Sequence, residues 1–249
     1  MHRFYQSSDQ IIDAEITLNK RESHHAISVL RVRKGDRVVV LDGVGGEFMC
    51  EVSSLEKKAV VLDVRNQSRT KPLPYRITLL QAMTKGKSMD FIIQKATELC
   101  VHRIVPLVAG RSVVQLEDVS AKLAKWNAIA IDSIKQCGSP WLPIIESPIT
   151  PKEFLDRNEQ FDLSVVASLQ SHTQHPRKFV DDYGSEHGVL PKTIGVWIGP
   201  EGDFTPSEVN SVLTAGVHPI TLGQVILRSE TAALYAVSVF NYEMQSPRD

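Results

Sequence analysis

The chain has 249 residues, of which 42% are hydrophobic and 23% charged, as is typical of a globular protein with one large domain or two modest ones. No apolar run is long enough to span a bilayer, and the N-terminus lacks the apolar core of a signal peptide, so we exclude a membrane protein and expect a cytoplasmic one. The net charge of −1 hides an asymmetry, because residues 1–139 carry 21 Lys+Arg against 15 Asp+Glu and residues 140–249 carry 7 against 14.

The first seventy residues are predicted to form a small β-rich domain. Strands are expected at residues 37–41, 47–52 and 59–64, and one or two helical turns at 23–30. The glycine cluster 42–46 looks like a dinucleotide-binding loop, but a strand follows it instead of a helix. We therefore predict a hairpin turn there.

The predicted linker is the polar segment 68–74, which contains two prolines. Basic residues are dense on both sides of it. Residues 20–37 carry six basic and two acidic residues and include His24-His25. Residues 65–103 carry eight basic and two acidic residues. Each cluster could be a solvated face of the protein. Because two clusters lie in one half of the chain, a surface that binds nucleic acid is an equally good interpretation.

After Pro74, strand-like runs alternate with helical ones, which predicts an α/β fold with a parallel sheet covered by helices. Strands are expected at residues 76–81, 103–108, 162–167, 194–198 and 219–222, and helices at 88–100, 119–137, 205–216 and 229–244. The third helix has a strong start, because Thr205 can cap it, Pro206 suits the first turn and Glu208 completes a capping box. Residues 170–191 are predicted to be an irregular, mobile excursion.

Two glycine-containing loops, residues 199–204 and 222–232, form the candidate ligand site. Each follows a predicted strand and precedes a predicted helix, and α/β sheets bind ligands at the carboxyl ends of their strands. Small residues there let backbone amides approach a ligand closely. Neither loop fits a familiar phosphate-binding pattern, and a pair of ordinary turns with a helix cap is the alternative.

Other patterns in the sequence give weaker evidence for a functional site. His172 and His175 have no cysteine or carboxylate ligand nearby, so no metal site is predicted. His24-His25 could contact phosphate or simply be an exposed pair. The three cysteines, Cys50, Cys100 and Cys137, are interpreted as reduced and buried rather than as redox or metal groups. Neither a Walker-type phosphate loop nor a Gly-x-Ser-x-Gly motif occurs.

A series of segments, taken in order and spacing, carries a family resemblance: Arg3-Phe4-Tyr5, 24–32, 87–99, 110–112, 126–136, 199–202 and 222–232. The chain resembles the SPOUT class of S-adenosylmethionine-dependent RNA methyltransferases. Within that class it is similar to the RsmE type, which methylates uridine N3 in 16S ribosomal RNA.

The chain departs from the family pattern at several positions. Gly110 stands where Glu is usual, Asp203 where Gly is usual, and Gln224-Val225 where Pro-Arg is usual. Cys100 replaces a common Gly, and Gly138-Ser139-Pro140 replaces a Gly-Arg. The two missing arginines would remove contacts to RNA or to a second subunit, so the resemblance defines the cofactor class better than the substrate.

The resemblance implies a PUA-like β-barrel over residues 1–70, which would bind RNA, and an α/β knot over residues 71–249. In such a knot the last helix is threaded through the loop that ends near Gly199. The resemblance also implies a homodimer whose pocket is completed near the subunit interface, acting on 16S ribosomal RNA of the small ribosomal subunit. The residues expected to bind S-adenosylmethionine are Gly199, Pro200, Glu201, Gly202, Leu222, Gly223, Ile226, Leu227, Thr231 and Ala232.

The proposed chemistry centres on Arg228 and Glu230. Uridine N3 must lose its proton before it can accept a methyl group, and Arg228 is expected to stabilise the resulting anion. Glu230 is a candidate base or an orienter of Arg228, and a simple ion pair between the two at a helix start is the alternative. Phosphate contacts are expected from Arg3, His24, His25, Arg31, Lys85, Lys87, Lys95 and Arg111.

Two rival functions stay open. One is a methyltransferase that acts on another RNA base or site, and the other is a non-catalytic RNA-binding or ribosome-assembly protein of the same fold. The glycines of both loops and Thr231 favour an enzyme over the second rival.

Overall fold

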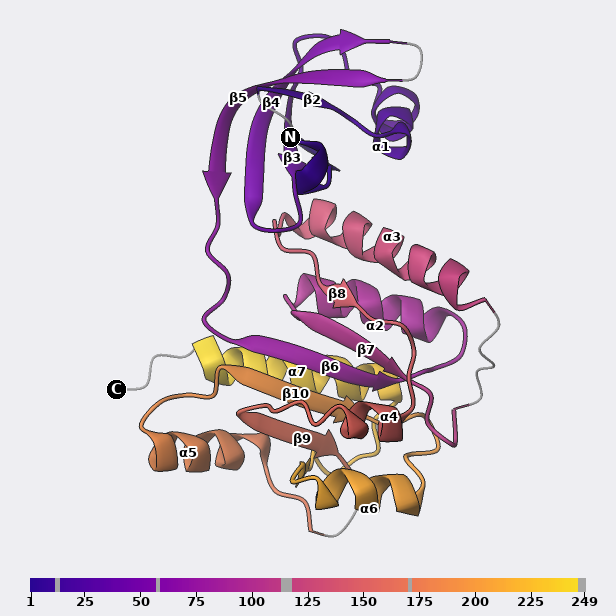
Figure 1. The fold of residues 1–249 in the computed structure, drawn as a ribbon, viewed down its shortest axis with the longest axis vertical. Coiled ribbons are helices and arrows are strands. Elements are labelled where there is room, and N and C mark those ends of the chain that lie inside the picture. The colour runs from indigo at the N-terminus through magenta and orange to yellow at the C-terminus, as the bar shows by residue number, and fades with distance from the viewer. Residues whose placement is uncertain (12–13, 57–58, 113–117, 170–171, 246–249) are drawn as a thin grey trace. The chain divides into compact units, whose positions relative to one another are not determined.

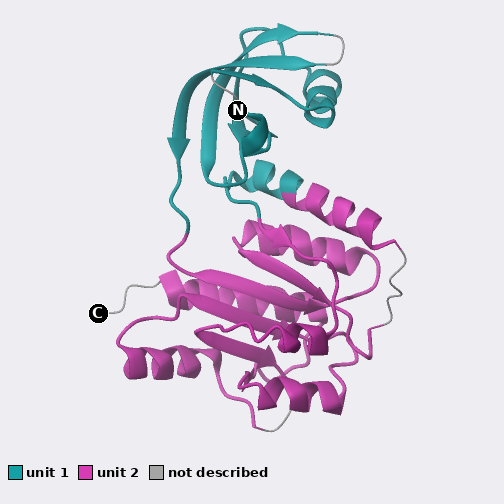
Figure 2. Ribbon diagram, viewed as in Figure 1, with its two compact units in different colours: residues 1–72, 131–142 teal, residues 73–130, 143–249 magenta. Residues whose placement is uncertain are grey.

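Two β-sheets with separate hydrophobic cores organise the chain. The computed structural model describes residues 1–11, 14–56, 59–112, 118–169 and 172–245 (Figure 1). The chain divides into two compact units (Figure 2). Unit 1 comprises residues 1–72 and 131–142, and unit 2 comprises residues 73–130 and 143–249. The domain expected over residues 1–70 lies within unit 1, but unit 1 also includes a segment from far along the chain.

Unit 1 contains a five-stranded sheet. In chain order its elements are β1 (His2–Tyr5), a 3₁₀ turn (Ser8–Gln10), β2 (Glu15–Thr17), α1 (Lys20–His24), a π-helical turn (His25–Leu30), β3 (Arg37–Leu41), β4 (Gly46–Leu55) and β5 (Val60–Arg69). The strand order is β1-β3-β4-β5-β2, with β1 parallel to β3 and the other pairs antiparallel. The predicted small β-rich domain is therefore confirmed.

The glycine cluster after β3 is a hairpin turn, as predicted. The Asp42 Oδ1 atom accepts hydrogen bonds from the backbone N–H of Val44 (2.8 Å) and of Gly46 (2.7 Å), and β3 pairs antiparallel with β4. The predicted linker was placed too early, because β5 continues to Arg69 in pairing with β4. Strands β1 and β2 were not predicted, since each has only three or four residues.

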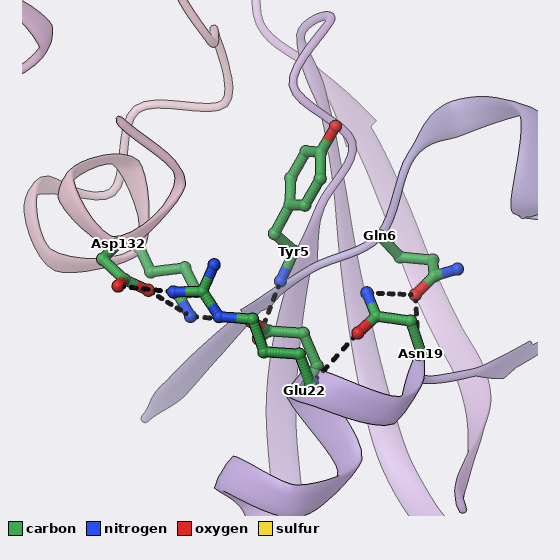
Figure 3. A network of polar contacts seen from close by, with 7 residues as sticks. Tyr5, Gln6, Asn19, Glu22 and Asp132 are labelled. Carbon is green, nitrogen blue, oxygen red and sulfur yellow. Dashed lines mark hydrogen bonds and ion pairs between the residues drawn. The ribbon is translucent and has the colours of Figure 1, made fainter. Parts of the chain in front are cut away.

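A polar network joins the C-terminal part of α3 (Val119–Cys137) to α1 within unit 1 (Figure 3). Glu22 accepts from Lys135 Nζ at 2.8 Å and from the backbone N–H of Tyr5 at 3.3 Å. Lys135 also pairs with Asp132 at 2.9 Å, and Asp132 accepts from Arg21 at 2.7 Å. The Glu22 and Lys135 side chains are only 2% and 9% exposed, so this pair is a buried part of the unit.

Unit 2 is built on a six-stranded sheet with the order β11-β9-β10-β6-β7-β8, and every pairing in it is parallel. The strands are β6 (Arg76–Ala82), β7 (Arg103–Leu107), β8 (Ile144–Ile145), β9 (Leu163–Ala167), β10 (Thr193–Ile198) and β11 (His218–Ile220). The helices other than α3 are α2 (Lys87–Glu98), α4 (Pro151–Asp156), α5 (Pro176–His187), α6 (Pro206–Thr214) and α7 (Ser229–Gln245). The predicted α/β class is confirmed, and the threading of the last helix stays a prediction.

Helices cover both faces of this sheet (Figure 1). On one face α7 packs against β6, β10, α2 and α5. On the other face α4 and α6 contact each other over a core that includes Phe154, Trp197 and Val212. The Trp197 ring meets the Phe154 ring edge-on at 5.3 Å between centroids. The sheet is thus covered on both sides, which leaves the ends of its strands as the places where a ligand can enter.

The expectation of an irregular excursion at residues 170–191 is wrong. Residues 176–187 form α5, which begins at Pro176. The His175 side chain caps the helix by accepting from the backbone N–H of Arg177 at 3.3 Å, and Gly188 ends it with a left-handed φ of 70°. Residues 170 and 171 lie outside the described residues. His175 thus acts as a helix cap, and among the described residues no group of three or more His, Cys, Asp or Glu side chains is placed to hold a metal ion.

The prediction that all three cysteines are buried is wrong for two of them. Cys50 is buried in unit 1, whereas Cys100 and Cys137 are exposed. Cys100 follows the end of α2 and Cys137 is the last residue of α3, where apolar neighbours face the core but the cysteine itself does not. No disulfide joins the three, which all lie among the described residues.

This difference predicts selective alkylation by iodoacetamide. Burial raises the pKa of the Cys50 thiol to about 11. At pH 8 only about one part in a thousand of that thiol is therefore the reactive thiolate. We expect Cys100 and Cys137 to be labelled in the folded protein and Cys50 to be labelled only in denaturant, as read by peptide mass spectrometry. Equal labelling of all three in the folded protein would contradict the burial of Cys50.

Candidate functional site

A cleft opens where three strands of unit 2 end. Residues from the segments 167–169, 198–203 and 221–232 line it. Because β9 lies between β10 and β11 in the sheet, the loops after all three strands meet at one edge. Both loops proposed from the sequence therefore contribute to a single cleft.

Most of the residues expected to bind a ligand line this cleft: Gly199, Pro200, Glu201, Leu222, Gly223, Ile226, Leu227 and Ala232. Gly202 and Thr231 belong to the same loops but do not line it. Sequence reasoning missed the third segment, Ala167–Leu169, and also Asp203 and Ser229. The third segment begins at the last residue of a predicted strand, so knowledge of the strand order would have found it.

The lining combines exposed apolar side chains with negative charge. Leu169, Val225 and Ile226 are 64%, 70% and 79% exposed, which leaves apolar surface available for a ligand to cover. The ionisable side chains among the lining residues are Glu201 and Asp203, both carboxylates. Such a lining suits a ligand that combines an apolar surface with a positive charge, and it is unsuited to the phosphates of a nucleotide.

Asp203 is accommodated by the turn that contains it. Its φ of 59° is left-handed, a conformation that Asp tolerates better than most residues. Its Oδ1 atom accepts from the backbone N–H of Phe204 at 2.8 Å. A Cβ atom added to Gly199 would lie 2.9 Å from that oxygen. The glycine therefore makes room for the carboxylate.

Ser229 joins the two predicted loops to the sheet. Its hydroxyl donates to the carbonyl oxygen of Gly199 at 2.7 Å and accepts from Gln81 Nε2 at 2.9 Å. Gln81, near the end of β6, is completely buried, and Ser229 is 4% exposed. One hydroxyl thus fixes the start of α7 against the loop after β10.

We expect Ser229→Ala to destabilise unit 2 by about 1–3 kcal/mol, because it leaves the Gly199 carbonyl and one Gln81 N–H without a partner in a buried place. Urea unfolding followed by circular dichroism measures the loss. Ser238→Ala, at an exposed position on the same helix, is the matched control and should change little. Equal stability of both variants would show that the hydroxyl does not hold the loop.

Arg228 and Glu230 flank Ser229 but do not line the cleft. Arg228 is exposed and Glu230 is half-buried, and neither forms an ion pair with a described residue. The alternative in which the two pair with each other at the helix start is therefore absent from the described structure. Arg228 is held by its backbone, because its carbonyl accepts from the Ala232 N–H at 2.8 Å, and its guanidinium is available to a ligand.

The loop after β7 is attached to the loop after β10. Arg111 Nη1 donates to the carbonyl oxygen of Gly202 at 2.8 Å, and the backbone N–H of Gly110 donates to Glu208 Oε1 at 2.8 Å. Glu208 also completes the capping box of α6 with Thr205, as predicted. Arg111 therefore supports one wall of the cleft as well as carrying charge.

Comparison with known proteins identifies the family. A family model described as an RNA methyltransferase domain matches residues 71–241. The chain belongs to this RNA methyltransferase family. A second family model, described as an RNA methyltransferase PUA domain, matches residues 18–65 within unit 1.

Relatives of this methyltransferase span nearly its whole length. It is 33% identical to ribosomal RNA small subunit methyltransferase E of Bacillus subtilis, over 92% of this chain and 90% of that one. A putative methyltransferase of Legionella pneumophila, solved with bound cofactor SAM, superposes with a TM-score of 0.87 at 28% identity, covering 96% of both chains. The small subunit methyltransferase E of Neisseria gonorrhoeae, bound to S-adenosyl methionine, superposes with a TM-score of 0.84 at 28% identity over 97% of both.

The basic residues of unit 2 that were expected to contact RNA differ in their exposure and in their ion pairing in this methyltransferase. Lys85 and Lys87 are exposed and flank the start of α2, next to the carboxyl end of β6. Lys95 is half-buried and pairs with Glu98 at 2.8 Å, which offsets its charge. Lys85 and Lys87 are thus better placed than Lys95 to bind phosphate.

Several residues of unit 1 that were expected to contact RNA make contacts within the unit itself. Arg3 Nη1 makes long contacts to the carbonyl oxygens of Lys135 (3.4 Å) and Gln136 (3.5 Å) at the end of α3. His24 pairs with Ser28 at 3.2 Å, and the His25 ring packs edge-on against Phe4. Arg31 is exposed and ends the π-helical turn with a left-handed φ of 54°. Arg3, His24 and His25 line one concave surface of this unit.

No helix among the described residues is long and apolar enough to cross a membrane.

Proposed function

We propose that this protein transfers a methyl group from S-adenosylmethionine to N3 of a uridine in 16S ribosomal RNA of the small ribosomal subunit. The observation that carries the proposal is the cleft at the ends of β9, β10 and β11, lined by apolar side chains and two carboxylates, in a chain of an RNA methyltransferase family. Relatives named for small-subunit ribosomal RNA, and neighbours solved with S-adenosylmethionine, support the substrate and the cofactor.

The lining fits S-adenosylmethionine on chemical grounds. Leu222, Ile226 and Leu227 offer apolar surface to an adenosine, and Gly223, with a φ of 119°, gives a backbone turn that a larger residue would strain. The carboxylates of Glu201 and Asp203 match the positive charge of a sulfonium. When bound, the cofactor supplies a methyl group already activated by the sulfonium.

The protein's own residues must then prepare the nucleophile. The N3 proton of uridine has to leave before the N3–methyl bond forms and the methyl–sulfur bond breaks. Arg228 would stabilise the uridine anion, because its guanidinium is exposed and has no ion-pair partner among the described residues. Glu230 would take the proton or orient Arg228.

Binding of the RNA would depend on basic side chains that contact its phosphates. Lys85 and Arg111 lie in the loops that follow β6 and β7, Lys87 is the first residue of α2, and Arg31 is exposed on unit 1. Affinity for RNA should therefore fall steeply as salt rises. The remaining cations, Arg3, His24, His25 and Lys95, are proposed as weaker contributors. We also propose that the enzyme is a cytoplasmic homodimer, in keeping with a ribosomal RNA substrate and the family resemblance.

Mass spectrometry of ribosomal RNA nucleosides from cells with and without the gene tests the proposal. We expect 3-methyluridine to disappear from 16S RNA without the gene and to return with a plasmid copy. Loss of a different methylated nucleoside would favour a methyltransferase for another base or site. An unchanged nucleoside profile, with no heat of S-adenosylmethionine binding in calorimetry, would favour the non-catalytic protein.

A further inference from the structure

The negative charge in the cleft is held in a defined position. The half-buried Asp203 carboxylate is fixed by its bond to the Phe204 N–H and lies against Gly199, which lines the cleft beside it. Glu201 is exposed, so solvent screens its charge more strongly. Asp203 is thus the lining carboxylate whose charge acts with the least screening.

A fixed negative charge affects the binding of the methyl donor differently from the binding of the product that the donor becomes. The donor carries a sulfonium, whereas the product after methyl transfer carries a neutral thioether, and the two are otherwise alike in their charged groups. A carboxylate near the bound ligand therefore stabilises the donor and has little effect on the product. The attraction does not need direct contact, since a charge acts over several ångströms in a partly solvated cleft.

We propose that Asp203 makes this cleft selective for the positively charged donor over its neutral product. This inference rests on the proposed function. The consequence of this selectivity would be weaker inhibition by the accumulated product, because the product would be displaced more readily by fresh donor.

Asp203→Asn is the isosteric test, because asparagine also tolerates a left-handed φ and its amide oxygen can still accept from Phe204 N–H. We expect affinity for S-adenosylmethionine to fall by about threefold to tenfold, while affinity for S-adenosylhomocysteine changes by less than about twofold. Isothermal titration calorimetry with each ligand measures both. Raising the salt concentration should reduce the preference in the wild type and have little effect in the variant.

Asp203→Gly serves as a second variant, since glycine suits the φ of 59° and removes the same charge. Asp156→Asn, at an exposed carboxylate of α4 that does not line the cleft, is the matched control and should leave both affinities unchanged. An equal loss for both ligands, or no loss for either, in the two Asp203 variants would overturn the inference. If the wild type bound neither ligand, the proposed function itself would fail instead.

Discussion

Replacing Arg228 with alanine is expected to lower turnover on small-subunit RNA by about 10²–10³-fold, the size of effect seen when one group that stabilises a developing anion is removed. Arg228 does not line the cleft, so affinity for S-adenosylmethionine should stay within about twofold of the wild type. Transfer of a radiolabelled methyl group to RNA measures the first quantity, and calorimetry the second.

Arg228→Lys is the informative control. It keeps the positive charge but loses the planar fork of the guanidinium, so it should restore part of the turnover if charge is what matters. Full turnover in Arg228→Ala would remove Arg228 from the chemistry. A loss of cofactor affinity equal to the loss of turnover would make Arg228 a binding residue for the donor and not a stabiliser of the uridine anion.

Replacing Lys135 with methionine is expected to destabilise unit 1 by about 3–5 kcal/mol, because the substitution leaves a buried carboxylate without its counter-ion. Glu22 is the affected carboxylate, 2% exposed and 2.8 Å from the Lys135 ammonium. The Tyr5 N–H, at 3.3 Å, would be its remaining bond among those described. Urea unfolding, followed by a probe that reports on unit 1, measures the change.

A matched control uses an exposed ion pair of the same kind. Lys152 pairs with Asp156 at 3.7 Å with side chains 87% and 64% exposed, so Lys152→Met should leave stability nearly unchanged. A second variant, Lys135→Met with Glu22→Leu, removes both charges and should recover much of the loss. If Lys135→Met unfolded at the wild-type urea concentration, the buried pair would contribute nothing measurable.

Local patterns were sufficient for many elements. Helix α3 has the predicted bounds, because an apolar residue recurs at helical spacing along its whole length. Helix α6 begins at its predicted capping box. The segment Thr150-Pro151-Lys152-Glu153 has the same pattern and forms the same capping box at the start of α4, although no helix is predicted there above. The physical signal for this helix is therefore present in the sequence.

Other features depend on contacts that no local pattern reveals. The third wall of the cleft, Ala167–Leu169, takes its place because β9 lies between β10 and β11, and strand order is a property of the whole sheet. The bond between Gln81 and Ser229 joins residues 148 positions apart. A buried glutamine near the end of a strand carries no sequence signal for its partner. Sequence reasoning therefore located the two loops but not what holds them together.

The inclusion of residues 131–142 in unit 1 has a consequence for synthesis on the ribosome. Residues 1–72 leave the ribosome first, and the part of unit 2 between 73 and 130 is made before the last segment of unit 1 appears. At roughly 5–20 residues per second, residues 73–142 take about 4–14 s to translate. During that interval Glu22 lacks its partner Lys135, although all five strands of the N-terminal sheet have already been made.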